Sequence, residues 1–185
     1  VYTIKAHQRV IFNGDGYSEA WVQEAARRGL PNLRSMVDAI PMLTTEKAVR
    51  LFERFGIYTK SELESHAEIM YETYAKVLKI EAKTMTHMAG KHYIPAAITY
   101  ITRLAASVGA VTQACPAADV SVQQELLVHI SRLLKQAKEA EDALITAVEK
   151  ANQTEEASGV AHLFHDEVVP VMTKLRATVD EMELL

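Results

Sequence analysis

The stretch TKSELESHAEIMYETYAKVL, residues 59–78, decides the fold. Its first four residues form a capping box, in which Thr59 and Glu62 each satisfy a free backbone amide of the other at a helix start. Apolar residues then recur every three or four positions, which is the spacing of one helix face. These residues are Leu63, Ala67, Met70, Tyr74, Val77 and Leu78. We expect a long helix that begins at Thr59 and continues past Ile80.

A second apolar series continues this helix, and a further arm follows it. The series lies beyond Pro95, where the missing amide hydrogen of proline predicts a kink. Its members are Ile98, Ile101, Leu104, Ala105, Val108 and Val111. The segment SVQQ, residues 121–124, then has the form of a second capping box. Near-heptad apolar residues follow up to Ala151 and are broken only at Glu141, so this arm would be roughly 45–50 Å long.

The last arm follows a break at residues 152–154, where we expect Thr154 to cap a helix. Its apolar residues are Val160, Phe164, Val168, Val171, Met172, Leu175, Val179 and Met182. Pro170 should bend this arm or shift its register. Long helices joined by short links fold back on one another. The predicted fold is therefore all-α, an elongated antiparallel bundle of three to four long helices preceded by short helices.

The residues before the bundle predict short elements. Residues 1–12 suit a short helix or a strand, and we favour the helix. NGDG, residues 13–16, predicts a turn. Short helices are then expected from Ser18 to Arg28 with Gly29 as the stop, over residues 35–40 before Pro41, and from Thr44 or Thr45 to Gly56. We divide the chain into a segment 1–30 made of a turn and a helix, short helices 31–58 that pack on the bundle, and the bundle 59–185.

Composition agrees with this fold and excludes several classes of protein. The 185 residues are 49% hydrophobic and include only seven Gly and five Pro, fewer than the turns of a sheet-rich enzyme need. No uncharged apolar run approaches about 20 residues, so we expect no membrane partner. The single cysteine, Cys115, allows no internal disulfide, which favours a cytoplasmic location. Residues 59–185 carry twelve Lys and Arg against eighteen Asp and Glu, which argues against nucleic acid as a partner.

One group of side chains resembles a metal site. His162 and His165 lie three residues apart and are followed by Asp166, so two of the three would share a helix face. An exposed amphipathic face explains the same spacing. A di-iron bundle would need Glu-x-x-His on two helices, and none of the eighteen Glu has His three residues later. We therefore assign no metal ligand.

No other group of residues predicts catalysis. Cys115 has no basic neighbour that would activate it. Residues 13–16 lack the spacing of a phosphate-binding loop, and a plain turn is favoured. Met70, Met85 and Met88 would suit either an adaptable groove or a core. Scattered histidines (His66, His87, His92 and His129) are expected to be packed or edge residues. We assign no catalytic and no cofactor-binding residue and expect that the chain alone is not an enzyme.

The opening string KAHQRVIFNGDGYSEAWVQEA, residues 5–25, is far more specific than these patterns. It resembles the segment that follows the catalytic core in type III glutamine synthetases. The resemblance continues through residues 28–33, 37–39, 51–56 and 59–63. It then covers Tyr74, residues 80–82 and 94–96, and spans the whole chain more loosely.

The resemblance implies a parent enzyme that joins glutamate and ammonia with ATP and a divalent metal, magnesium or manganese, in a large homo-oligomer. Its metal-binding carboxylates and its Asn-Gly-Ser-Gly-Met-His motif have no counterpart here, so no active-site residue is carried over. Val1 in place of an initiator methionine is expected of a segment cut from a longer chain.

Two functions follow as expectations. The first is a non-catalytic C-terminal domain for subunit packing or positioning, with the rest of the synthetase chain and neighbouring subunits as partners. The second is a stand-alone helical adaptor that binds a partner through an apolar helix face.

Overall fold

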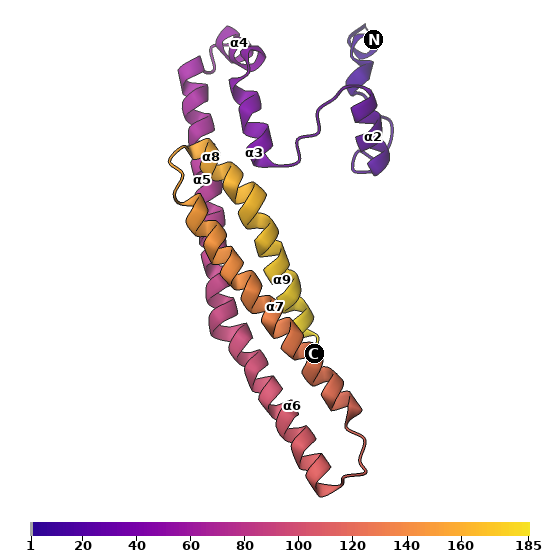
Figure 1. The fold of residues 1–185 in the computed structure, drawn as a ribbon. Helices are drawn as coiled ribbons and strands as arrows, with labels where there is room; N and C mark the ends of the chain where they lie inside the picture. Colours follow the sequence, from indigo (N-terminus) through magenta and orange to yellow (C-terminus); the bar gives the residue numbers. More distant parts are fainter. Residues whose placement is uncertain (1) are drawn as a thin grey trace.

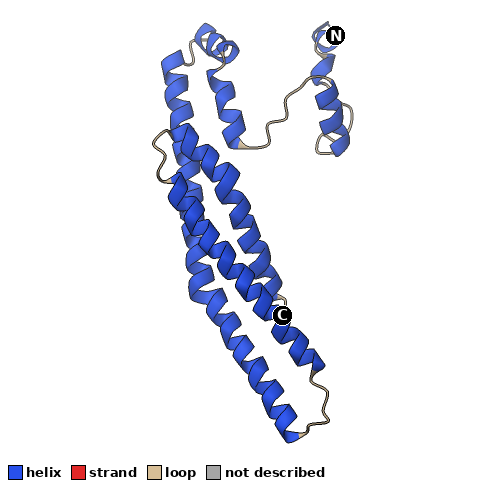
Figure 2. Ribbon diagram, in the orientation of Figure 1, coloured by secondary structure: helices blue, strands red, loops and turns tan. Residues whose placement is uncertain are grey.

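The computed structural model describes residues 2–185, and all regular structure in this range is helical (Figure 2). The α-helices are α1 (Tyr2–Ala6), α2 (Glu19–Arg27), α3 (Met36–Ala39), α4 (Glu46–Arg54), α5 (Lys60–Met88), α6 (Ile94–Ala114), α7 (Ser121–Ala151), α8 (Ala157–Leu163) and α9 (Val169–Glu183). Short 3-10 turns occupy Gln8–Val10 and Ile40–Thr44. The predicted all-α class is confirmed, and the opening residues form helix rather than strand.

Three long arms build the bundle. The first is a continuous helical run, Lys60–Ala114, that joins α5 to α6. Helix α7 returns along it, and α8 with α9 forms the third arm (Figure 1). Helix α7 packs on α6 and α9, and α5 packs on α8. Because α9 stops before the tip, α6 and the first part of α7 extend beyond it as a pair (Figure 1).

The core follows the predicted apolar stripe only in part. Leu63 and Ala67 are buried as predicted, whereas Met70, Tyr74 and Leu78 are half-buried. In the series after Pro95, Ile98 and Ala105 are exposed.

On α5 the buried residues are Leu63, Ala67, Tyr71, Ala75 and Ala82. Ala75 and Ala82 pack with Leu144, Phe164 and Leu175 from the other arms. Ala67 and Tyr71 lie in the adjoining cluster beside α3. Val77, expected in the stripe, is 47% exposed. At about 100° per residue it lies a quarter-turn from Leu78, outside the buried series.

Both predicted proline distortions are present as π-helical turns. One covers Ala89–Tyr93 and the other Phe164–Val168, and each leads into an α-helix whose second residue is Pro95 or Pro170. A π turn inserts one extra residue and so shifts the register of everything after it. The register shift predicted at Pro170 is confirmed, and near Pro95, where a kink was predicted, the first arm has a π turn.

Capping residues and glycines in the sequence predicted most helix ends correctly. The Thr59 capping box is complete, with Glu62 N–H donating to Thr59 Oγ1 at 3.3 Å and Thr59 N–H donating to Glu62 Oε2 at 2.7 Å. Ser18 and Thr45 cap α2 and α4 with their hydroxyl oxygens, which accept the N–H of Trp21 and of Ala48. Gly29 and Gly56 adopt positive φ of 66° and 61° after these helices. Only glycine enters this region readily, so both helices end there.

Two predicted helix caps are wrong. Ser121 is the first residue of α7 and not its cap, because the Asp119 carboxylate takes the Ser121 N–H at 2.9 Å. That hydrogen bond also lowers the pKa of Asp119. Thr154 does not cap α8, which begins after Glu156. The α-helix before Pro41 ends as predicted, at Ala39, and a 3-10 segment with Pro41 in its first turn follows it.

Residues 2–30 stand apart from the bundle. They comprise α1, a 3-10 turn, a loop and α2, and the extended residues 31–34 lead from them to α3 (Figure 1). Helices α3 and α4 lie beside the start of α5. We call residues 2–30 the N-terminal unit.

The first arm departs from the expectation that no segment suits a bilayer. It contains an 18-residue stretch of mean hydropathy 1.4, so by length and composition alone it is long and apolar enough to cross a membrane. Counting uncharged runs missed it because Arg103 divides α6. Only 6% of the stretch is buried. Core helices of soluble proteins pass the same test, and α6 packs along α7.

Candidate functional site

The structure gives the two histidines of the suspected metal site separate partners. His162 Nδ1 lies 2.7 Å from the main-chain oxygen of Ser158, and its ring faces Tyr71 at 6.0 Å between centroids. His165 Nδ1 lies 2.6 Å from Asp166 Oδ1. Within residues 2–185 there is no group of three or more His, Cys, Asp or Glu side chains placed to hold a metal ion. The donor set for a divalent metal is therefore not present in the part of the chain that the structure describes.

The glycine-rich tetrapeptide forms the predicted turn. Asp15 Oδ1 accepts the Tyr17 N–H at 2.9 Å, and Ser18 Oγ donates to the Asp15 carbonyl at 2.7 Å. A Cβ at Gly14 would lie 2.7 Å from the Phe12 ring, so a larger residue here would displace that ring. These bonds tie the turn to the start of α2. Cys115 is exposed at the end of α6.

An open apolar groove of about 400 Å³ runs between α5 and α9. Met85, Met88 and Met172 line it, so two of the three methionines that suited either a groove or a core face this groove. Met70 instead packs in the cluster beside α3. The polar members of the lining are Glu81, Thr173, Arg176 and Asp180. This arrangement suits the binding of an apolar surface and brings together no nucleophile with a base.

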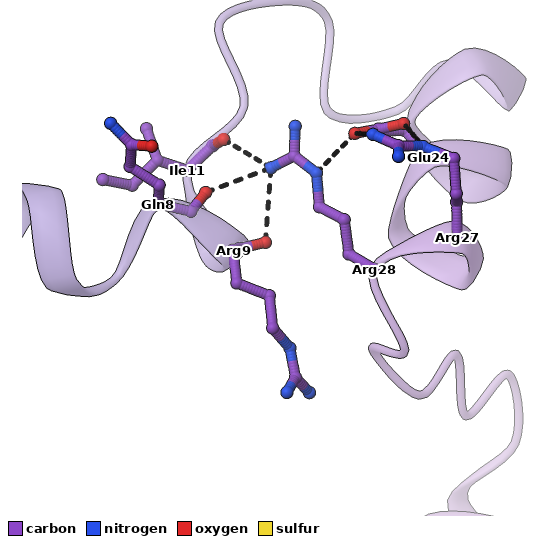
Figure 3. A network of polar contacts seen from close by, with 6 residues as sticks. All are labelled: Gln8, Arg9, Ile11, Glu24, Arg27 and Arg28. Carbon is purple, nitrogen blue, oxygen red and sulfur yellow. Dashed lines mark hydrogen bonds and ion pairs between the residues drawn. The ribbon is translucent and has the colours of Figure 1, made fainter.

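A polar network holds the N-terminal unit together (Figure 3). Arg28 Nη1 donates to the main-chain oxygens of Gln8, Arg9 and Ile11 at 3.2, 3.3 and 2.7 Å. Its Nε donates to Glu24. One guanidinium thus joins the residues before the loop to the end of α2. The planar fork of arginine, with five donors, makes this possible.

Glu24 is the acidic centre of that network. Hydrogen bonds from Arg27 and then Arg28 stabilise its carboxylate and lower its pKa from 4.5 to about 2. Phe12 stacks on Trp21 with ring centroids 4.6 Å apart, and Arg28 lies 5.5 Å from the centre of the Trp21 ring. The stacked pair of Phe12 and Trp21, with the Arg28 guanidinium near the Trp21 ring, therefore closes the loop between Phe12 and α2.

Sequence reasoning missed one buried charge. Glu141 lies in the core of α7, 7% exposed, and Lys138 Nζ donates to its Oε2 at 2.9 Å. Its other oxygen occupies the space over Gly90, where a Cβ would approach it to 2.6 Å. The break in the heptad pattern at Glu141 was the signal for this contact. It joins α7 to the first π turn.

Taken together, the geometry defines an elongated helical domain with an open apolar groove and a separate small unit at its beginning. The family follows from comparison. The chain belongs to the family described as glutamine synthetase C-terminal domain, whose model matches residues 1–112. The resemblance seen in the opening string is thereby confirmed.

Three relatives extend the match beyond residue 112. The chain is 33% identical over 183 residues to a glutamine synthetase of Butyrivibrio fibrisolvens, covering 99% of the chain and 26% of that protein. It is 30% identical to the type-3 glutamine synthetase of Dictyostelium discoideum, covering 98% of the chain and 25% of the relative. A glutamine synthetase of Bacteroides fragilis gives 30%, with 98% and 25% covered. The chain spans about a quarter of the length of the curated relatives it matches.

Proposed function

We propose that this chain is the non-catalytic C-terminal helical domain of an ATP-dependent glutamate–ammonia ligase and that it serves subunit packing or positioning. The observation that carries the proposal is the match of nearly the whole chain to about a quarter of each glutamine synthetase. ATP and the divalent metal would be bound by the rest of such an enzyme, in the cytoplasm. The relatives are about four times as long as this chain, which favours a domain over a stand-alone adaptor.

Surface chemistry supports a packing role. The groove between α5 and α9 is open and mostly apolar. Outside it, Ile80, Ile98 and Val128 are all at least half exposed. Apolar surface of this extent is typical of a domain that contacts other parts of an assembly. The partners expected are the remainder of the synthetase chain and neighbouring subunits.

The first test separates domain from enzyme. The 185-residue chain is incubated with glutamate, ammonia, ATP and magnesium or manganese, and glutamine is measured. We expect none above background from the chain and glutamine from the full-length polypeptide. Glutamine formed by the chain alone would overturn the non-catalytic role.

The second test addresses packing. Residues 59–185 are deleted from the full-length polypeptide, and the mass of the assembly is measured by light scattering. We expect a smaller or less stable assembly. Met88→Glu, which places a charge in the groove without removing the core, separates surface loss from misfolding. Gln136→Glu adds the same charge at an exposed polar site on α7 and is the control. An assembly of unchanged mass and stability in the deletion would contradict the packing role.

A further inference from the structure

The N-terminal unit carries its apolar side chains on the outside. Tyr17 is 100% exposed, and Tyr2, Ile4 and Val10 are each more than 60% exposed. Ala25 is the one residue classed as buried among residues 2–30. So many exposed aromatic and aliphatic residues in so short a stretch are typical of a surface that a partner covers.

The unit is too small to support itself. Domains below about 40 residues usually need a disulfide, a metal or a partner, because they bury too little apolar surface. The chain's one cysteine is Cys115, far along the sequence at the end of α6. Residues 2–185 contain no candidate metal cluster. The Arg28 network orders the loop but adds no core, so a partner is the remaining source of stability.

The bundle of this chain does not provide that partner. The hydrogen bonds and ion pairs described for residues 2–30 all stay within the unit. The unit is held away from the long helices by residues 31–34 (Figures 1 and 2). Its exposed side chains therefore face no surface of the chain that the structure describes.

The polypeptide that precedes this domain in a full-length synthetase is the partner that fits the N-terminal unit. The relatives are about four times as long, and the family is a C-terminal domain, so most of such a protein comes before the position of α1. A surface joined covalently within a few residues is present at an effective concentration of about millimolar. No separate partner competes easily with it.

We propose that the N-terminal unit docks, through the surface that includes Tyr2, Ile4, Val10 and Tyr17, on the preceding part of its own polypeptide, while the bundle is attached to it only through residues 31–34. The inference rests on the proposed function, because it requires that a synthetase core precedes the domain. It adds which part of the domain makes that contact.

Hydrogen–deuterium exchange read by mass spectrometry tests this directly. Amides of residues 2–30 are compared between the 185-residue chain and the full-length polypeptide. We expect at least about tenfold slower exchange in the full-length polypeptide, because docking suppresses local opening. Equal exchange in both would overturn the proposal.

Matched variants locate the contact. Tyr17→Ser and Val10→Ser replace side chains that touch little in the 185-residue chain, so neither should change its circular dichroism. In the full-length polypeptide we expect each to lose at least about tenfold of the protection over residues 2–30. Val128→Ser, at an apolar site on α7 that is 71% exposed against 62% for Val10, should leave that protection unchanged.

The remaining outcomes would show that another surface covers the N-terminal unit. If Val128→Ser removes the protection as strongly, or if protection of residues 2–30 in the 185-residue chain rises with its concentration, the unit docks on a second copy of the bundle and the proposal is wrong. Glutamine synthesis is measured on the same samples. Protection without synthesis refutes only the proposed function, and synthesis without protection refutes only the docking.

Discussion

The bundle and the N-terminal unit are both helical, but different forces hold them together. In the bundle, Leu133, Leu144 and Phe164 are essentially removed from water. In the unit, the ordering contacts are those of Arg28 and the Phe12–Trp21 pair. Apolar burial contributes about 25 cal/mol per Å², whereas ion pairs at the surface contribute little. The bundle should therefore be stable by itself, and the unit should open first.

The two regions can be observed separately in one sample. Trp21 is the only tryptophan in the chain and lies in the unit. Far-ultraviolet circular dichroism reports mainly the long helices of the bundle. A urea titration followed by both signals should show the Trp21 transition at lower urea, which is the basis of the predictions below.

The largest effect is expected from the bundle core. Phe164 is 1% exposed, so Phe164→Ala should cost about 3–5 kcal/mol of unfolding free energy through lost burial and the cavity it leaves. The circular dichroism transition moves to lower urea and the Trp21 transition stays in place. Val128→Ala, at a 71% exposed position, is the control and should change neither. A parallel shift of the Trp21 signal in Phe164→Ala would show that the two regions unfold as one.

The reciprocal experiment targets the unit. Arg28→Lys keeps the charge but cannot reach the carbonyls of Gln8, Arg9 and Ile11 together with Glu24. It should destabilise the unit by about 1–3 kcal/mol, measured by Trp21 fluorescence in urea. The bundle transition should not move. Arg27→Lys, which removes only contacts to Glu24, should have a smaller effect, and equal effects would mean that the carbonyl contacts are unimportant.

A third prediction sharpens the description of the bundle, whose core includes one charge. Gly90→Ala places a Cβ 2.6 Å from the buried Glu141 carboxylate and should cost about 1–3 kcal/mol through overpacking. Gly109→Ala, in open space on α6, should stabilise by about 0.5–1 kcal/mol because alanine restricts the unfolded chain. Both are read by circular dichroism in urea.

A double variant isolates the contact behind that cost. In a Glu141→Ala background the oxygen that opposes the new methyl group is gone, so Gly90→Ala should become neutral or stabilising. If Gly90→Ala is equally costly in both backgrounds, the penalty comes from the π turn and not from Glu141.

The sequence predicted correctly the helix caps whose donor and acceptor lie within a few residues of each other. Ser18, Thr45 and Thr59 each lie three residues before the amide they cap, so the pattern and the contact coincide. The cap predicted at Ser121 failed. The Gln124 N–H that Ser121 would cap donates to the Val120 carbonyl, and Asp119 accepts the N–H of Ser121 itself. Short polar side chains near a helix start offer several such bonds, and the sequence does not rank them.

The groove and the separate N-terminal unit could not be predicted from the sequence, because both depend on how the helices are placed against one another in the fold. Met85 and Met88 have the same spacing whether a helix covers them or not, so their exposure depends on how α9 lies against α5. The division 1–30, 31–58 and 59–185 stays a prediction. Residue spacing likewise could not indicate that Arg28 would span twenty residues to reach Gln8, because that reach depends on how the loop closes.

The smallest effect is a pH dependence confined to the unit. The pKa of Glu24 is lowered to about 2 by Arg27 and Arg28, below its ordinary 4.5, so its carboxylate favours the folded unit at all pH above that ordinary value. This stabilisation is lost as the pH falls from 4.5 through about 2, because the unfolded unit takes up the proton first. The Trp21 transition should therefore move to lower urea in that range. Glu24→Gln, which has no proton to take up, should show a flatter dependence, and an unchanged pH profile in this variant would assign the effect to another carboxylate.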